Sequence, residues 1–200
     1  MGSKYITQQV EELLLQALET ERGGIQIYTT AIQSAQNEDL RKEWEEYLEQ
    51  TQHHEEVLTG VFEQLGMDTE KQSPGRDIVA MLGESLVAAI ETARATGTPE
   101  SAELVAAECV VLAETKDHQN WELLGRVAKQ GGPLSKALKP AYEEVEEDED
   151  HHLYHTKGWC RELWIQSLGM SAVLPPPEEV KDVDTAIGAA RAEKARDKMT

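Results

Sequence analysis

Apolar residues recur at intervals of three and four along almost the entire chain, and this spacing constrains the fold more than any other feature of the sequence. Such a period keeps one face of an α-helix against a core, whereas a half-buried strand alternates apolar and polar residues. Neither that alternation nor clusters of β-branched residues bounded by turns are found in the sequence. The sequence therefore predicts an all-α protein.

Residues that favour helix ends divide this pattern into four long segments and a shorter one. Thr7 is a favourable N-cap, Gly66 stands where the second long pattern ends, and Thr98 precedes a proline that suits the first helical position. At a rise of 1.5 Å per residue, the long helices would each measure about 40 to 50 Å. The expected long helices are residues 7–35, 37–66, 99–130 and 133–168, and the expected shorter helix is 77–96.

Four long helices of similar length predict a ferritin-like four-helix bundle over residues 1–168. Segment 77–96 would be the helical crossover that joins two antiparallel pairs. A chain of 200 residues with 40% hydrophobic content can bury such a core without disulfides or a structural metal. Residues 169–200 lie outside the bundle in this interpretation. Their prolines predict an extended C-terminal arm, followed by a polar helical tail from about Val183 that straps onto the surface or frays.

The charge balance excludes two classes of partner. Asp and Glu number 38 against 19 Lys and Arg, which gives a formal net charge of −19 and argues against nucleic acid or an anionic membrane. The chain has no apolar run near the roughly 18 residues of a membrane span, and its start does not resemble a signal peptide. Cys109 and Cys160 lack metal-ligand spacing and are too few for a disulfide framework. We therefore expect a soluble, cytoplasmic protein with two reduced thiols.

Polar residues interrupt the apolar stripe of every long helix. An unpaired buried carboxylate is costly or becomes protonated, so it is usually retained only when it is paired or bound to a metal. In the acidic run 143–150, eight consecutive residues cover about 800° of helix rotation, so some of its carboxylates must point inward. The residues that interrupt the stripes are Glu21, Thr51, His54, Glu114, His118, Glu149 and His152.

The two halves of the chain also share a degenerate repeat. The first half carries Glu-x6-Tyr followed by EQTQHHEEVL, and the second carries Glu-x6-Trp followed by EDEDHHLYHT. Superposition of the halves predicts a pseudo-twofold cluster of carboxylates and imidazoles in the middle of the bundle. The equivalent pairs are Glu21 with Glu114, Tyr28 with Trp121, Thr51 with Glu149, and His54 with His152.

This cluster matches the carboxylate pattern of di-iron and di-manganese proteins, in which two helices each supply a Glu and two each supply Glu-x-x-His. Glu149 and His152 form the complete motif, whose spacing lets the carboxylate bridge two ions while the imidazole caps one. The predicted metal ligands are Glu21, His54, Glu114, Glu149 and His152.

The second helix departs from the pattern, because Thr51 stands where a bridging carboxylate is expected. Gln50, Glu55 or His118 could compensate, or one metal position could be weak or empty. His118 could instead orient a ligand from outside the cluster. Tyr28 is either core packing or an aromatic neighbour of a redox centre.

The doubled histidines leave a choice of register. His53, His151 and His155 are expected at the surface. A shift of one residue would instead bring His53 with Glu49, and His151 with Glu147, to the cluster. For Glu21 and Glu114 the alternative to metal ligation is a buried carboxylate hydrogen-bonded to Tyr, Trp or His.

Over roughly residues 7–168 the chain resembles ferritin-like proteins, and among them the YciE/YciF-type stress-associated family. The resemblance rests on YLEQTQHHEEVLTGVFEQLG, on AMLG in segment 77–96, and on Glu114-x2-Asp117-x3-Trp121, where the family tends to show E-x2-E-x3-Y. That family also tends to have Thr-x-x-His in the second helix, as Thr51 and His54 do here. EDEDHHLYHTKGWCRELW departs from the family. The resemblance implies a helical bundle with a metal centre and a link to stress.

These observations predict a centre of two iron or manganese ions that reacts with dioxygen or peroxide, as an oxidase or peroxidase in stress protection. The alternatives are a non-catalytic metal-binding or storage bundle and a metal-free helical interaction protein whose acidic surface binds a basic partner. A homodimer is compatible with each, whereas the C-terminal tail disfavours a ferritin-like cage.

Overall fold

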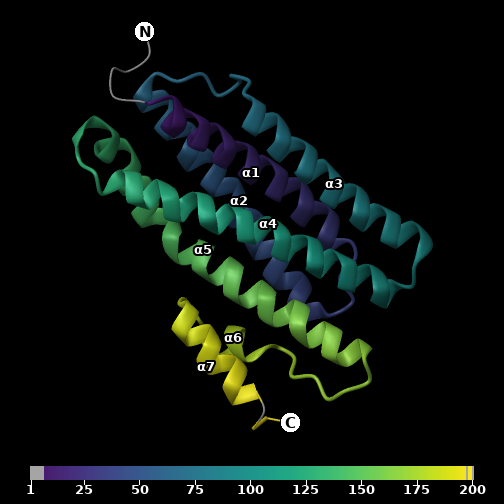
Figure 1. Cartoon of the computed structure of the whole chain (residues 1–200). Coiled ribbons are helices and arrows are strands. Elements are labelled where there is room, and N and C mark those ends of the chain that lie inside the picture. The colour runs from purple at the N-terminus through teal and green to yellow at the C-terminus, as the bar shows by residue number, and fades with distance from the viewer. Residues whose placement is uncertain (1–6, 197, 200) are drawn as a thin grey trace.

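The protein is all-helical in the computed structural model, which describes residues 7–196 and 198–199 (Figure 1). The described residues contain no strand, which confirms the predicted class. None of the helices among them is both long enough and apolar enough to cross a membrane. The described helices are α1 (Gln8–Ile32), α2 (Glu38–Leu65), α3 (Pro74–Thr96), α4 (Pro99–Ala128), α5 (Gly132–Ser167), α6 (Pro177–Val180) and α7 (Ala186–Arg196).

The helices begin and end where short-range hydrogen bonds satisfy their free backbone groups. The Thr7 hydroxyl accepts a bond from the amide of Val10, and Thr98 caps α4 in the same way. Gly66 ends α2 with a φ of 66°, a conformation that glycine adopts without steric cost. Helix α3 begins three residues before the expected Asp77, because the Ser73 hydroxyl caps it and Pro74 fits its first turn.

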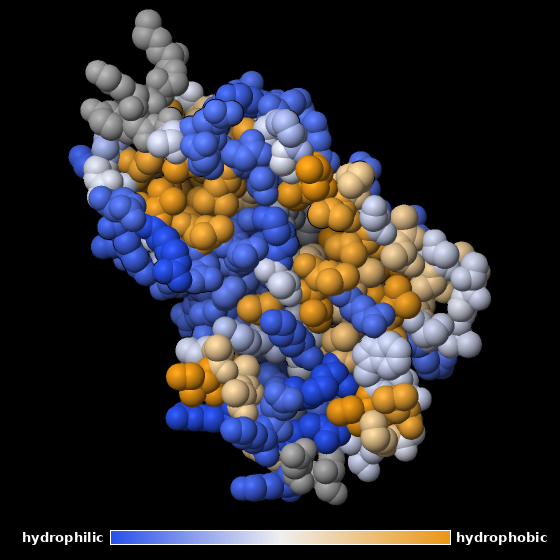
Figure 2. Space-filling view, viewed as in Figure 1, coloured by the Kyte–Doolittle hydropathy of each residue, from blue (hydrophilic) through white to orange (hydrophobic). Residues whose placement is uncertain are grey.

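The four longest helices contact one another in a closed ring. Helix α1 packs against α2 and α4, and α5 packs against the same two helices from the other side. Helix α3 lies outside this ring on α1 and α4, as Figure 1 shows. Exposed apolar residues such as Leu82 of α3 and Leu112 of α4 give the surface over these two helices a hydrophobic area (Figure 2). The ring therefore presents one apolar stripe from each of four helices to a common interior.

The interior consists of two apolar clusters with a polar layer between them. One cluster includes Tyr28, Trp44 and Trp159, and the other includes Leu58 and Trp121. On each helix of the ring, roughly two to four turns separate the residues of the first cluster from those of the second. The predicted ligands lie within those intervening turns, so the core packs above and below the candidate site.

The C-terminal arm lies against α5 (Figure 1). Glu178, at the start of α6, is 2% exposed and accepts two hydrogen bonds of 2.8 and 2.9 Å from Arg161. The fully buried Glu162 accepts from the amide of Val173 at 2.8 Å and from Arg196 at 2.7 Å. These contacts fasten the arm at both ends. Its last helix begins at Ala186, three residues after the expected Val183.

Candidate metal centre

All five predicted ligands meet in the polar layer between the two apolar clusters. They come from α1, α2, α4 and α5, and no side chain among them is more than 3% exposed. The ring of helices therefore holds a compact group of carboxylates and imidazoles away from solvent, as the stripe pattern predicts. The five residues are Glu21, His54, Glu114, Glu149 and His152.

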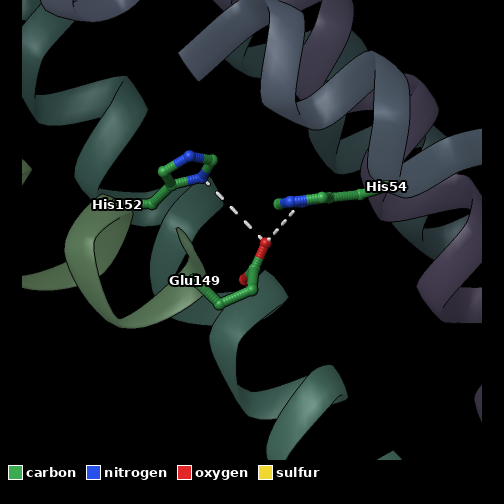
Figure 3. A group of neighbouring side chains, drawn as sticks. All are labelled: His54, Glu149 and His152. Carbon is green, nitrogen blue, oxygen red and sulfur yellow. Dashed lines mark ion pairs between the residues drawn. The ribbon is translucent and has the colours of Figure 1, made fainter. Parts of the chain in front are cut away.

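Two imidazoles face one carboxylate oxygen at the centre of this group. His54 Nδ1 lies 3.1 Å from Glu149 Oε1, and His152 Nδ1 lies 4.0 Å from the same oxygen (Figure 3). His54 Nδ1 is also 3.9 Å from Glu21 Oε1, and His152 Nδ1 is 3.5 Å from Glu114 Oε2. Glu149 therefore occupies the position from which one carboxylate can reach a cation on either side.

The outer nitrogen of each imidazole is held by a polar partner. His54 Nε2 lies 3.3 Å from Asp148 Oδ2, and His152 Nε2 lies 2.9 Å from Gln50 Oε1. The Gln50 amide donates to Asp148 Oδ1 at 3.2 Å, so these two residues also hold each other. Metal-binding histidines commonly donate their second N–H to such a partner, which leaves the other nitrogen free to bind the ion. Gln50 is therefore placed to orient a ligand.

Several donor atoms in the cluster are buried without a hydrogen-bond partner. Buried polar atoms are nearly always paired, so a convergent set without partners requires a physical reason. A cation would bind these atoms together and offset their charge. The unpaired atoms are Oε2 of Glu21, Glu114 and Glu149, Oδ1 of Asp117, and Nδ1 of His54.

The electrostatics of the cluster also favour positive charge. Burial, together with the neighbouring carboxylates, raises the pKa of Glu21 and of Glu149 well above the ordinary range, and it raises the pKa of Asp117 to about 8. Burial lowers the pKa of His152. Burial also opposes the protonation of His54, but Asp148 and Glu21 outweigh it and raise its pKa. Negative charge therefore accumulates here only when protons or a cation accompany it.

Asp117 is a member of the cluster that the stripe analysis overlooked. Its side chain is 4% exposed, and carboxylate oxygens of Glu21, Asp117 and Glu149 lie within 4.8 Å of one another. The sequence signal was its position three residues after Glu114, which places the two on one face of α4. His118, assigned to that stripe, is instead partly buried outside the cluster, 2.8 Å from Asp150. Asp117 thus supplies a carboxylate that α2 lacks.

Thr51 and Glu55 do not supply the missing carboxylate in α2. The Thr51 hydroxyl donates to the Tyr47 carbonyl at 2.8 Å within its own helix. Its methyl group faces Gly24, where an added Cβ would lie 3.2 Å from it. Glu55 is partly buried and accepts a hydrogen bond of 2.9 Å from Arg22. Helix α2 therefore contributes a single candidate ligand, His54.

Tyr28 lies beside the cluster. Its ring is 6.2 Å from the His152 ring in an edge-on arrangement, and its side chain is 1% exposed. Burial and the Glu114 carboxylate raise the pKa of Tyr28 well above its ordinary value. The phenol is therefore held neutral next to the ligands.

The structure selects one register for the doubled histidines. His54 and His152 point inward, whereas His53 is 51% exposed and lies 2.8 Å from Glu144. The alternative partners, Glu49 and Glu147, are exposed. The prediction that His155 lies at the surface was wrong. Its side chain is 7% exposed, because α2 and the C-terminal arm cover that part of α5.

Six donor residues thus converge in the interior, four with carboxylates and two with imidazoles. No protein-family model, curated protein or solved structure matches the chain. The ferritin-like resemblance accordingly stays a prediction, and the case for a metal centre depends on geometry and charge. Oxygen donors with a few imidazoles suit iron or manganese, whereas sites for softer ions use thiolates.

Proposed function

We propose that this chain is a ferritin-like four-helix bundle, with α3 as its helical crossover, that holds two iron or manganese ions. The observation that carries the proposal is the orientation of the two histidines. His54 and His152 are fixed through Nε2 by Asp148 and Gln50. Both turn Nδ1 toward buried carboxylates that each have one oxygen without a hydrogen-bond partner. This arrangement suits a metal ion better than a proton, because several carboxylate oxygens and Nδ1 atoms converge where few N–H or O–H groups can donate to them.

The charge of the cluster agrees with two divalent ions. Glu21, Glu114, Asp117 and Glu149 carry four negative charges when ionised, and two divalent cations carry four positive charges. Glu149 lies between both imidazoles, so its carboxylate would help to hold both ions (Figure 3). Asp117 replaces the carboxylate missing at Thr51, which makes the centre asymmetric.

Iron or manganese in such a site supplies redox chemistry with dioxygen or peroxide, which is the oxidase or peroxidase activity we propose for stress protection. The protein's own part is to position the ions and exclude water. The Trp121 indole donates to Glu21 at 2.7 Å and orients that carboxylate. Tyr28 and Trp121 close the layer on its two apolar sides. A cytoplasmic location is part of this proposal and agrees with the free thiols of Cys109 and Cys160.

The test is the metal content of the full chain produced in medium rich in iron and manganese. We expect about two ions per chain, as a site of this ligand pattern binds. E149Q should lose both ions, whereas the matched control E147Q, two residues away on the exposed side of α5, should keep them. A folded wild-type chain without metal would refute the proposal and favour the metal-free interaction protein.

Catalysis and storage are separated by a second measurement on the loaded protein. Consumption of oxygen or peroxide over many turnovers, abolished in E149Q, supports an oxidase or peroxidase. A single stoichiometric oxidation that stops after one turnover per centre indicates a non-catalytic metal-binding or storage bundle.

A further inference from the structure

A second group of metal-binding residues lies where the C-terminal arm covers α5. His151 and His155 stand four residues apart on that helix, so both rings project from the same face. Asp182 follows α6 in the arm and reaches the same place. One donor atom from each of these three residues lies within 4.8 Å of the others. This group contains none of the six donors of the central cluster.

The distances fit two ligands of one ion better than a direct hydrogen bond. His151 Nε2 lies 3.5 Å from Asp182 Oδ1, beyond the usual hydrogen-bond range. Two ligands at zinc-type bond lengths in a tetrahedral site are separated by about 3.4 Å. The rings of His151 and His155 are nearly parallel, with centroids 5.0 Å apart. Small side-chain movements would bring all three donors onto a single cation.

An independent observation points to the same place. His155 is 93% buried at its side chain, yet its Nε2 has no hydrogen-bond partner. Its Nδ1 lies 3.0 Å from the Tyr47 hydroxyl and 3.5 Å from Glu43 Oε1. These outer groups orient the ring and leave Nε2 as the nitrogen available to an ion, the arrangement usual for a metal-bound histidine.

The surrounding pocket is acidic and holds a fourth potential donor. Glu179 in α6 lines it, and the buried Oε2 of this residue has no hydrogen-bond partner. Lys42 is the single lysine or arginine among the described lining residues, against five acidic side chains. The acidic lining residues are Asp39, Glu43, Glu46, Glu179 and Asp182. Asp39, Glu46 and Asp182 are exposed and attract a cation before any specific ligand bond forms. Burial raises the pKa of Glu43 and raises the pKa of Glu179 to about 9, so these two ionise only beside a cation.

We propose that His151, His155 and Asp182 bind one zinc-like divalent cation that fastens the middle of the C-terminal arm to α5. Imidazole nitrogens with a carboxylate are the donors that zinc and cobalt(II) favour. The ion pairs of Glu178 and Glu162 hold the arm on either side of Asp182 along the chain. The cation adds a third attachment of the arm to α5, at Asp182 between those two ion pairs. The site is independent of the central centre and does not require the proposed oxidase.

The test uses the full chain and cobalt(II) as the probe, followed by competition with zinc. H151A and D182A should each weaken the tetrahedral cobalt(II) absorption and lower the affinity by at least about tenfold, since even the loss of a residue that only orients a ligand has an effect of that size. Both side chains are at least partly exposed, so these variants should keep the fold. H53A removes an exposed histidine outside the group and is the matched control.

Hydrogen exchange then tests the role of the ion. Zinc should slow exchange in residues 177–196 of the wild type and have no effect on that segment in D182A. Unchanged cobalt(II) binding in H151A and D182A, or an equal loss in H53A, would overturn the site. Binding without slower exchange would overturn its fastening role. E149Q, which empties the central centre, should bind this cation normally, so the two proposals fail separately.

Discussion

The Trp121 indole of α4 donates a hydrogen bond of 2.7 Å to Oε1 of Glu21 in α1, while Oε2 of the same carboxylate has no hydrogen-bond partner. In the internal repeat, Trp121 is equivalent to Tyr28 and Glu21 to Glu114. The charge of Glu114 acts on Tyr28 in turn. Trp121 therefore binds a carboxylate from the other half of the chain, and Tyr28 is influenced by the charge of the equivalent carboxylate.

W121F should weaken the binding of iron(II) or manganese(II) by about tenfold to a hundredfold, because the hydrogen bond that orients Glu21 is lost while an aromatic ring is kept. Calorimetric titration measures this change. W164F is the matched control, since that indole is 41% exposed and donates to Glu108 at the surface. Equal affinities for W121F and wild type would show that Trp121 only packs.

D117N should reduce the bound metal from about two ions to about one per chain, because it removes the carboxylate that we assign in place of Thr51. The side chain keeps its shape, so the fold should persist. D150N, which changes the surface partner of His118, should retain both ions. Elemental analysis of the purified variants measures the count. Two ions in D117N would exclude Asp117 as a ligand.

Removal of metal should destabilise the protein, because the buried carboxylates lose the charge that offsets them. Manganese(II) at one hundred times its dissociation constant should raise the free energy of unfolding by about 2.7 kcal/mol relative to protein treated with a chelator. Denaturant unfolding measures the difference. E149Q should show little of it, and a chelator-insensitive wild type would argue that no ion is bound.

The C-terminal arm should detach from α5 in acid, because protonation of Glu162 weakens its bonds to the arm. Burial opposes the ionisation of this residue, but the Val173 amide, Arg196 and Arg161 outweigh it and lower its pKa below 4.5. A lowered folded-state pKa means that the stabilisation is complete above pH 4.5 and is lost as the pH falls through the folded value. The Val173 amide donates directly to Glu162, so the NMR chemical shift of this amide should follow the titration. In E162Q that titration should disappear, and its persistence would assign it to another group.

Gly24 and Thr51 should be energetically coupled. G24A places a Cβ 3.2 Å from the Thr51 methyl group, so that the two helices must shift. T51S removes this methyl group and keeps the hydroxyl. The double variant should be more stable than the sum of the single changes by about 1 kcal/mol, as measured by denaturant unfolding. Additive effects would show that the helices adjust freely at this contact.

The sequence by itself determined the helices and most of the candidate ligands. Helix limits at Thr7, Gly66 and Thr98 depend on hydrogen bonds within a few residues, so local sequence is sufficient to predict them. The inward positions of Glu21 and His54 follow from helical periodicity, because a polar residue on an apolar stripe must enter the core with it. The same argument predicted Glu114, Glu149 and His152.

Only the tertiary structure decided which neighbouring residues complete the sites. Asp117 and His118 differ by 100° around α4, and the packing of α4 against α1 and α5 turns Asp117 inward. His155 is buried because both α2 and the C-terminal arm cover that part of α5. Asp182 reaches α5 only because the chain folds back after the last long helix. Helical periodicity allows either Asp117 or His118 beside Glu114, and it carries no information about contacts between residues distant in sequence, such as that of Asp182 with α5.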